Sequence, residues 1–527
     1  PQTQEKWVDE WARFMKNSEE DIRTFTVDIN PDPERGQGPQ WTILMQTMAR
    51  VGGGEYYAVH EDFDAARIVA IVTEILSGIL AADSVFASVT LPASSGTQST
   101  FLNQVFIGVF RPDPLAKPKW PGNTKQYKLG RPGGPGTAIR LVDQDDRAAI
   151  DQETGFFQEC SRSFWTDSVT GRDDYWEFLN GSGGCLTPSS SADYDTPDGP
   201  NVEKGAQAYM MRESSHSTRT VYTCSATFTG CEDSADSLTS FVTGNPGILA
   251  DDIGASPLER NEYINWMRGQ DVDDVNGDGS TAETRAYVHA DVVHSRPLAW
   301  DFNSDPNDPD IVVFYGSNDG MLKAVNGNQT GTGAGDEYWA FLPPEAYDNI
   351  ETLRENTAEI GFPSSGANAG VGISKPYGFD GQLALYQEDV DDDSLPDRWL
   401  FGGMRRGGRV VYALDVTNIG SPQLKWKVGC DDDDNCTTGG DFDDIGQTWS
   451  PISVTYSNGY DIETGTAKSP ILLMGGGYDE CEDDDNDGGD PDSGVAPVNN
   501  SCTDSSRGRG VYVLDANDGS LLKYLPT

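Results

Sequence analysis

The pattern of apolar and polar positions divides the chain into an N-terminal stretch with helical periodicity and a longer stretch of short β-type runs. Near the N-terminus, Trp7, Trp11 and Phe14 recur at a spacing that places them on one face of a helix. Because strands that alternate with helices favour a parallel sheet, residues 1–86 predict an α/β fold, although the stretch is too short for a complete domain of that class. The predicted elements are a helix over 4–17, a strand over 22–29, a helix over 39–50, a strand over 55–59 and a helix over 63–81.

From residue 87 the pattern changes to short apolar runs separated by Gly, Pro and Asp. Runs at 101–110 and 126–129 favour strands that are joined by turns. Residues 160–260 are polar and rich in Ser, Thr and Gly, which favours long loops. We therefore expect residues 87–290 to be a β-rich linker and loop region that holds the early strands of the domain that follows.

A repeat of four strand-like segments becomes visible after residue 290. Each unit opens near a proline, continues as an apolar strand that runs into Gly, then as a strand that ends in Asp or Asn, and closes with an aromatic strand. The units follow one another at roughly 75–85 residues. The prolines are Pro297, Pro376 and Pro451; the apolar strands are 311–315, 399–401 and 471–474; the next strands are 321–326, 410–415 and 511–515; and the closing aromatic residues are Trp339, Trp426 and Tyr524.

Four strands per unit, repeated along 291–527, predict the blades of a β-propeller. The order G-x-x-x-Y-x-L-D, present at 408–415 and 508–515, is also similar to quinoprotein-like propellers. A β-sandwich with coincidental spacing is the alternative. Since three recognisable units cannot close a ring, we expect an incomplete propeller, with further blades before residue 290, after residue 527, or both. The expected fold class is mainly β, a partial propeller of four-stranded blades with long insertions, preceded by an α/β stretch.

The chain is strongly acidic, with 37 Lys and Arg against 85 Asp and Glu and a net charge of −48. This charge repels nucleic acid and anionic lipid, so neither is an expected partner. It favours divalent cations, although a salt-adapted surface has the same composition. No stretch reaches about 18 consecutive apolar residues, so we expect no membrane span. The chain begins at Pro1 without a signal peptide, which we interpret as removal of a front segment or as a piece of a longer protein.

The eight cysteines fall into four sequential pairs, and none of them forms a zinc or haem motif. Their even number and their loop-like surroundings favour four local disulfides, formed in an oxidising compartment. Unpaired thiols are the alternative, which the exposed, Asp-rich flanks disfavour. The expected pairs, assigned by proximity, are Cys160–Cys185, Cys224–Cys231, Cys430–Cys436 and Cys481–Cys502.

Three Asp-rich segments have the spacing of calcium ligands, because alternate residues of a tight loop direct carboxylates toward one centre. The first has Ser394 where such loops have Gly. The second begins like an EF-hand loop, with Gly279 at the turn, but Arg285 at position 12 excludes a complete EF-hand, and Glu283 is the substitute ligand in a shorter loop. Surface charge is the alternative for each segment, and we interpret 431–434 as a solvated acidic tip. The candidate ligands are Asp389, Asp391, Asp393 and Asp397 in the first segment, Asp274, Asn276 and Asp278 in the second, and Asp483, Asp485 and Asp487 in the third.

Catalytic motifs are weak in this chain. His289 and His294 lie near the start of a unit, without a zinc-protease pattern or a His/Asp/Ser order, and we interpret both as structural. The glycine-rich segment 130–136 lacks the Lys-Ser/Thr of a phosphate loop and is interpreted as a turn-rich linker. Arg405 and Arg406 lie between glycines, where they either stabilise a blade or bind a partner.

Short motifs in order along nearly the whole chain resemble the PilY family of type IV pilus tip proteins. This resemblance implies a von Willebrand factor A-like domain followed by a modified, calcium-binding propeller. Residues 1–86 would then be the C-terminal part of the first domain, without its metal-binding D-x-S-x-S segment, and a calcium loop described for the family would lie beyond residue 527. The motifs are SVFAS at 84–88, LNQVF at 102–106, FRPD at 110–113, KQY at 125–127, WMRGQD at 266–271, HSRP at 294–297, YGSNDG at 315–320, GMRRGG at 403–408, GQTWS at 446–450, GGGYD at 475–479 and VLD at 513–515.

The resemblance also implies a function without catalysis, in pilus assembly, in counteracting retraction, in surface adhesion and in twitching motility. The implied partners are the minor pilins of a pilus tip complex and a host or abiotic surface. The implied location is the pilus tip or the bacterial cell surface, reached through the periplasm. One alternative is a quinone-dependent dehydrogenase, for which the chain lacks an adjacent pair of cysteines. The other is a structural, calcium-bridged component of an extracellular filament.

Overall fold

The computed structural model places the described residues in two compact units, Pro1–Ser84 with Asp167–Gly199, and Val85–Thr166 with Pro200–Thr527. No helix in the described ranges is long and apolar enough to cross a membrane. The residues that the structure describes are 2–16, 23–29, 39–59, 86–90, 103–151, 155–158, 160–166, 197–224, 231, 238–275, 279–303, 308–361, 372–388, 396–431, 436–437, 440–456, 470–479 and 507–527.

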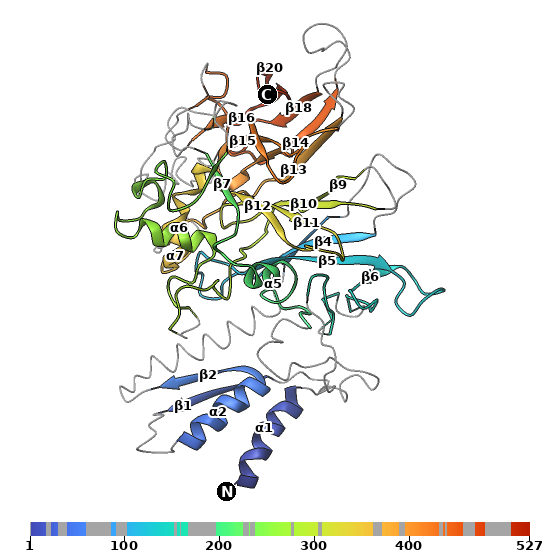
Figure 1. Cartoon of the computed structure of the whole chain (residues 1–527), viewed down its shortest axis with the longest axis vertical. Coiled ribbons are helices and arrows are strands. Elements are labelled where there is room, and N and C mark those ends of the chain that lie inside the picture. The colour runs from blue at the N-terminus through green and yellow to red at the C-terminus, as the bar shows by residue number, and fades with distance from the viewer. Residues whose placement is uncertain are drawn as a thin grey trace, which may run out of the picture. The chain divides into compact units, whose positions relative to one another are not determined.

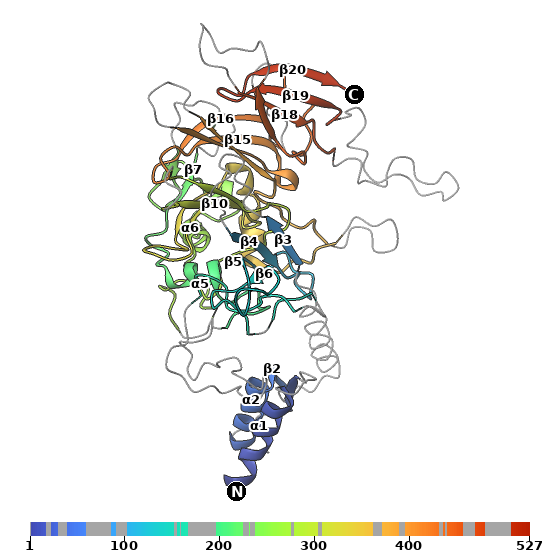
Figure 2. The ribbon, with the colours of Figure 1, turned by 90° about the vertical axis from the view of Figure 1, so that its right-hand side faces the viewer.

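The first unit contains the predicted helix–strand alternation. The parallel strands β1 and β2 pair with each other, and helix α2 packs on both of them and on α1 (Figures 1 and 2). Trp11 and Phe14 contact each other edge to face, with ring centroids 5.5 Å apart, yet both remain more than half exposed, so the predicted apolar face is not buried within the described part of this unit. The helix predicted over 63–81 lies outside the described residues. The bounds are α1 (Gln2–Lys16), β1 (Thr24–Ile29), α2 (Pro39–Val51) and β2 (Gly53–Val59).

The second unit is built, in its described part, from antiparallel sheets whose strands follow one another in sequence. We number these sheets I to IV. Sheet II gains two strands because β7 pairs in parallel with β12 and β8 pairs with β7. Sheet I contains β3 (Phe86–Thr90), β4 (Gln104–Phe110), β5 (Gly122–Gly130) and β6 (Arg140–Val142); sheet II contains β7 (Val221–Thr223), β8 (Thr239–Ser240), β9 (Leu298–Asp301), β10 (Ile311–Gly316), β11 (Leu322–Asn326) and β12 (Glu337–Phe341); sheet III contains β13 (Leu383–Glu388), β14 (Asp397–Gly403), β15 (Arg409–Asp415) and β16 (Gln423–Cys430); sheet IV contains β17 (Ser453–Tyr456), β18 (Pro470–Gly475), β19 (Gly510–Asp515) and β20 (Leu521–Pro526).

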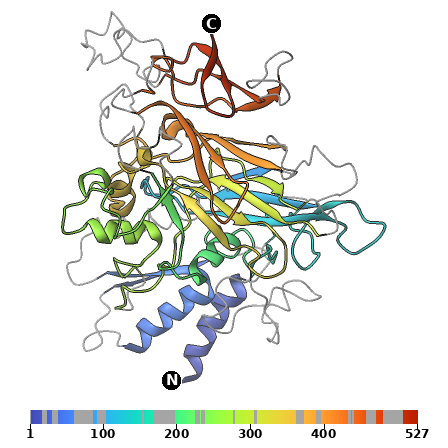
Figure 3. The same cartoon turned by 45° about the horizontal axis from the view of Figure 1, so that its top comes forward.

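The four sheets pack face to face in the order I, II, III, IV (Figures 1 and 3). Alternate residues of each central strand point to opposite faces, so one strand contributes to two interfaces. In β10, Val313 packs toward sheet I and Phe314 toward sheet III. In β14, Leu400 packs toward sheet II and Phe401 toward sheet IV. The inward positions of the predicted repeat therefore form the cores between neighbouring sheets.

An indole side chain connects each sheet to the next one in the row. Its Nε1–H donates to a backbone carbonyl in the turn between the third and fourth strands of the following sheet. In two of the three contacts a turn glycine with positive φ lies against the indole, where a Cβ would come within 2.6 Å (Gly335) or 2.7 Å (Gly519) of the ring. The hydrogen bonds run from Trp165 to Asn328 at 2.8 Å, from Trp339 to Ile419 at 2.8 Å and from Trp426 to Ala516 at 3.0 Å.

Helices cover one side of sheet II, and a further helix, α5 (Ala206–Glu213), lies within residues 160–260, for which the sequence predicted long loops. Helices α6 and α7 contact each other and enclose a cluster that contains Ile264, Leu342 and Leu353 (Figure 1). Within each helix the buried apolar positions recur at helical spacing, Ile264 and Met267 in α6, and Ile350 and Leu353 in α7. The helices and 3₁₀ turns of this unit are α5 (Ala206–Glu213), η3 (Asp251–Ile253), α6 (Arg260–Arg268), η4 (Pro344–Ala346), α7 (Asn349–Glu355) and η5 (Arg405–Gly407).

The first strand of the middle repeat begins later than predicted. The segment around Pro376 is not a strand, and β13 starts at Leu383. The intervening residues cross from sheet II to sheet III: the Gly378 N–H donates to Asn318 Oδ1 at 3.2 Å, and Phe379 fills the core between the two sheets. The proline therefore marks a crossover between sheets, whereas in the first repeat β9 follows Pro297 directly.

Candidate functional site

The first Asp-rich segment forms the connection between β13 and β14. Glu388 and Asp397 are Cα partners at the ends of these two strands, so residues 389–396 connect a hairpin. Asp397 is the first residue of β14. The remaining candidate ligands of this segment, Asp389, Asp391 and Asp393, lie outside the described residues.

The second segment is a loop that is closed at its base by an antiparallel bridge between Gln270 and Thr284. Asp274 adopts a positive φ of 50°, and its carboxylate accepts the Gly279 N–H at 3.1 Å. Arg285, which occupies the position of the missing EF-hand glutamate, has its guanidinium 4.2 Å from the Trp266 ring centroid and donates to the Trp266 carbonyl. Arg285 therefore has a packing role. Asn276 and Asp278 lie outside the described residues.

The third segment, with Asp483, Asp485 and Asp487, lies outside the described residues, as do Cys185, Cys481 and Cys502. Cys224–Cys231 and Cys430–Cys436 are disulfides, in the expected pairing. Cys160 is also disulfide-bonded. Within the described ranges, no three His, Cys, Asp or Glu side chains gather closely enough to form a metal site. Calcium binding by the Asp-rich segments thus stays a prediction.

The two histidines near the first repeat differ in their surroundings. His289 is fully buried, with Nδ1 2.7 Å from the Ala290 carbonyl and Nε2 2.9 Å from the Tyr315 hydroxyl. Burial lowers the pKa of His289 to about 3, with a smaller contribution from the nearby Lys323 ammonium, so this ring is neutral near pH 7. His294 is partly exposed, and its Nδ1 lies 2.5 Å from Asp380 Oδ2.

His294 and Asp380 belong to a group of cations and aromatic rings where sheets III and IV meet, which we call the Arg–Trp cluster. It is assembled from the turn η5 between β14 and β15, the segment before β9, the crossover before β13, and the segments that flank β17 and β18. The glycines around η5 permit this assembly, since a Cβ on Gly407 would lie 1.8 Å from the Gly378 carbonyl oxygen. The members of the cluster are His294, Tyr377, Asp380, Arg405, Arg406, Trp449 and Tyr478.

Positive charge exceeds negative charge in the Arg–Trp cluster. Asp380 is buried and is shared by His294 and by Arg405, whose Nη1 lies 3.6 Å from Asp380 Oδ2. The Arg405 and Arg406 guanidinium carbons lie 4.3 Å and 4.7 Å from the Trp449 ring centroid. Among the described residues no carboxylate pairs with Arg406. The planar fork of donors on such a stacked guanidinium has the geometry that binds a carboxylate.

The backbone of Arg405 is unusual as well. This residue has a φ of 55°, in the left-handed region that side chains other than glycine seldom adopt. Such conformations persist where the surrounding structure enforces them, and they recur at functional sites. The sequence analysis singled out Arg405 and Arg406, but Asp380 and Trp449 were not connected with them, because they are distant in sequence and meet only when the sheets pack.

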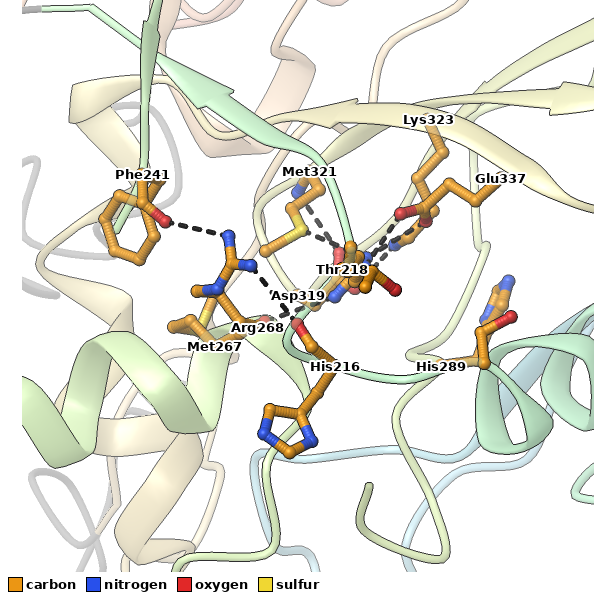
Figure 4. A network of polar contacts seen from close by, with 12 residues as sticks. His216, Thr218, Phe241, Met267, Arg268, His289, Asp319, Met321, Lys323 and Glu337 are labelled. Atoms are coloured by element: carbon orange, nitrogen blue, oxygen red, sulfur yellow. Dashed lines mark hydrogen bonds and ion pairs between the residues drawn. The ribbon is translucent and has the colours of Figure 1, made fainter. Parts of the chain in front are cut away.

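A second polar feature, which the sequence analysis missed, is a network of ion pairs beside β11 and β12 (Figure 4). Lys323 is fully buried in β11 and bonds Asp319 Oδ2 at 2.5 Å. Arg219 forms two hydrogen bonds to Glu337, at 2.7 Å and 3.0 Å. The signal in the sequence is a lysine at an inward position of a strand that is otherwise apolar, and it recurs at Lys427, which pairs with Glu345 at 2.5 Å.

Residues 300–458 match the family described as the PilY1 beta-propeller domain. The type IV pilus biogenesis factor PilY1 homolog of Xylella fastidiosa is 28% identical over 191 residues, which cover 31% of this chain and 13% of that protein. The type IV pilus biogenesis factor PilY1 of Pseudomonas aeruginosa strain UCBPP-PA14 is 25% identical over 244 residues, which cover 40% of this chain and 18% of that protein. The aligned regions thus span less than a fifth of the length of these relatives.

A crystal structure of the Pseudomonas aeruginosa PilY1 C-terminal domain aligns with 41% of this chain and 30% of that chain, at 18% identity and a TM-score of 0.23. The match to the propeller family extends from the end of β9, through sheet III, to the end of β17. It confirms the prediction of propeller-type strands over this range, whereas the von Willebrand factor A-like origin of residues 1–86 stays a prediction. The matching propeller domain and the matching pilus biogenesis factors together support the assignment of this chain to the PilY family.

Proposed function

We propose that this chain acts at the tip of a type IV pilus, where it promotes pilus assembly, surface adhesion and twitching motility. The observation that carries this proposal is the match of residues 300–458 to the PilY1 beta-propeller domain. The site of action is the extracellular face of the bacterium, which the protein reaches through the periplasm. The disulfide between Cys430, the last residue of β16, and Cys436 is in keeping with an oxidising compartment.

The Arg–Trp cluster is the proposed contact for a minor pilin. In a chain of net charge −48, a partly exposed arginine without an acidic partner is a rare attachment point for an acidic group. Arg406 presents such a guanidinium, held against Trp449 and 5.6 Å from the Tyr377 ring centroid. A carboxylate of the pilin would form two parallel hydrogen bonds with it. A host or abiotic surface would be bound elsewhere on the protein.

Purified minor pilins of the same bacterium test this contact. Replacement of Arg406 with Ala should weaken binding by about tenfold or more, because a charge-assisted pair contributes about 1.5–3 kcal/mol. Arg406→Lys should retain part of the affinity, since lysine keeps the charge and loses the fork of donors. Arg140→Ala, a change of a partly exposed arginine in β6, is the matched control. Unchanged affinity in Arg406→Ala overturns the proposed contact.

The same variants test the cellular function. Introduced at the chromosomal locus, Arg406→Ala should reduce surface pili and the twitching zone, whereas Arg140→Ala should leave both at wild-type levels. Immunoblots of the exported protein separate loss of function from loss of the protein. If removal of the whole gene leaves piliation and twitching intact, the assignment to pilus biogenesis is wrong.

Calcium is the proposed ligand of the β13–β14 connection. Asp389 follows the last residue of β13 and Asp397 begins β14, so the two residues enter the connection from its opposite ends. Four aspartates at this spacing repel one another, and a divalent cation relieves that repulsion. The double variant Asp391→Asn/Asp393→Asn should therefore lose calcium uptake in calorimetry. Asp432→Asn/Asp433→Asn, in the predicted acidic tip, removes the same charge and should behave like the wild type. Equal uptake by both variants excludes this connection as a calcium site.

Binding, and not catalysis, is the proposed activity. A quinone-dependent dehydrogenase would oxidise an alcohol and reduce a dye acceptor when pyrroloquinoline quinone is supplied. We expect no turnover above the rate of the free quinone. Turnover that depends on the protein and on the quinone would overturn the proposal that the chain acts by binding alone.

A further inference from the structure

A cavity of about 220 Å³ lies in the second unit, between α5, residues 214–220, the end of α6 and the start of β12. Its volume is below the range of about 300–1,000 Å³ that is typical of sites for drug-sized ligands. It is therefore of the right size for a single small ring. Figure 4 shows part of its wall, where Arg268 lies beside His216, and the imidazole of His216 points away from the ion pairs.

The two arginines in the wall are already bonded within the protein. Arg219 is bonded to Glu337 and also donates to the Met267 carbonyl at 3.2 Å. Arg268 donates to the carbonyls of Phe241, His216 and Ser217, each at 3.2 Å. The two guanidinium groups are balanced in number by the carboxylates of Glu337 and Asp336, so a ligand of either charge gains little here.

Two neutral side chains in the wall, by contrast, hold polar atoms without a partner among the described residues. Gln207 is fully buried, and within the described ranges neither its amide oxygen nor its amide nitrogen forms a hydrogen bond. Nδ1 of His216 is buried and likewise has no partner in the part of the chain that the structure describes. A buried polar group without a partner costs about 1–3 kcal/mol, so these atoms indicate a missing hydrogen-bonding ligand. Burial, followed by the nearby Arg268, lowers the pKa of His216, which keeps its ring neutral near pH 7.

The remaining lining selects among neutral ligands. Five hydroxyl groups line the cavity, and two methionines and a valine provide apolar contact. The hydroxyls of Thr218 and Thr284 donate to backbone carbonyls and that of Ser215 bonds Ser217, and an oxygen that donates in this way still has a lone pair with which to accept from a ligand. A peptide carboxamide would satisfy Gln207 alone. A sugar ring carries hydroxyls on several sides and an apolar face of C–H groups, so it matches Gln207, His216, the hydroxyls and the apolar wall together. The hydroxyl residues are Ser214, Ser215, Thr218, Thr220 and Thr284, and the apolar residues are Met210, Met211 and Val288.

We propose that this cavity binds one neutral sugar residue, with the carboxamide of Gln207 bridging two neighbouring hydroxyls and the Nδ1 of His216 bonding a third. The proposal concerns a site apart from the Arg–Trp cluster and the Asp-rich segments. It does not depend on pilus biogenesis, because its test uses the purified chain and free sugars.

The test is titration of the purified chain with glucose, galactose, mannose and N-acetylglucosamine, followed by calorimetry and by saturation-transfer NMR. At least one sugar should bind saturably. Gln207→Met preserves the shape of the side chain and removes its donor and acceptor, so it should weaken that sugar by about tenfold, the equivalent of two neutral hydrogen bonds. Gln104→Met is the matched control, a buried glutamine in β4 that does not line the cavity, and should bind like the wild type.

Three results overturn the proposal: saturable binding of none of the four sugars, equal binding by Gln207→Met and the wild type, or binding of N-acetylglutamine amide in their place. If Gln207→Met does not fold, as judged by its melting curve, His216→Phe replaces it. That variant removes only the third hydrogen bond and should weaken the sugar by about fivefold, and unchanged affinity again overturns the proposal.

Discussion

The indole contacts between neighbouring sheets make a quantitative prediction about Trp426. This residue is 3% exposed, its Nε1–H donates to the Ala516 carbonyl at 3.0 Å, and its ring lies 5.7 Å from that of Phe401. Gly519, with a φ of 74°, lies flat against the indole. Trp426→Phe keeps an aromatic ring in this position and removes the N–H. It therefore isolates the contribution of the hydrogen bond between sheets III and IV as closely as one substitution permits.

The magnitude follows from burial. Ala516 is fully buried, so its carbonyl loses a partner and gains no water, which costs about 1–3 kcal/mol. The smaller ring leaves a gap that adds about 1 kcal/mol. We expect Trp426→Phe to lower the free energy of unfolding by about 2–4 kcal/mol, with sheet IV released first, because sheet IV packs on sheet III in the described row.

Urea unfolding followed by hydrogen exchange measures this effect and locates it. Trp300→Phe is the control, because its indole N–H bonds the partly exposed side chain of Gln387 at 2.6 Å, and its loss should cost less than about 1 kcal/mol. A Trp426→Phe protein within about 0.5 kcal/mol of the wild type would refute the reasoning. Both indoles bond across neighbouring sheets, so an equal loss in the two variants would show that burial of the acceptor is irrelevant.

Three further perturbations test the second unit. Lys323→Met leaves the Asp319 carboxylate buried without its ammonium partner. It should lower the free energy of unfolding in urea by about 3–5 kcal/mol, and the double variant Lys323→Met/Asp319→Asn should recover part of that loss. Burial holds the pKa of His289 at about 3, so the unfolded chain binds a proton at this residue before the folded chain does as the pH falls. The free energy of unfolding should therefore decrease by about 1.4 kcal/mol per pH unit below about 6.5. His289→Gln should flatten this slope in acid titrations of the melting temperature. Cys430→Ser with Cys436→Ser opens a loop with a sequence separation of 6 and should cost about 2 kcal/mol, measured against the wild type under non-reducing conditions, while an unchanged melting temperature would contradict this estimate.

The strands of the repeats could be predicted because their signals are local. The runs at 311–315 and 410–415 combine apolar alternation with a closing Gly or Asp, and they are β10 and part of β15 in the structure. The closing aromatics Trp339 and Trp426 were recognised as a repeat, but their role was not. Their hydrogen-bond acceptors lie 80 and 90 residues further along the chain, so only the packed sheets reveal them. Trp165 performs the same role from a loop that has no repeat signal.

The candidate sites were predictable to different degrees. Arg405 and Arg406 stood out because two cations between glycines are rare in so acidic a chain. Their contacts with Asp380 and Trp449 could not be predicted, because Asp380 is brought to them by the crossover after Pro376 and Trp449 by the packing of the sheets. The cavity around Gln207 was invisible in the sequence, since its walls come from four separate segments. The Asp-rich loops are the opposite case: their spacing is evident in the sequence, and the ligands of the first and third lie almost entirely outside the described residues.

The indole contacts have one direction. Sheets II and III each donate a hydrogen bond from a tryptophan to a turn carbonyl of the sheet after them, and Trp165 donates one to sheet II from a loop. Besides its apolar faces, a sheet in this row uses two positions to join its neighbours, a tryptophan and a turn carbonyl, and neither position depends on the length of the loops between its strands. The architecture is modular in this sense. Insertions between strands, such as the acidic connection after β13, can change in length or in chemistry while the contacts between the sheets stay the same. Diversity in what such a protein recognises can accumulate in its loops while the sheets remain interchangeable parts.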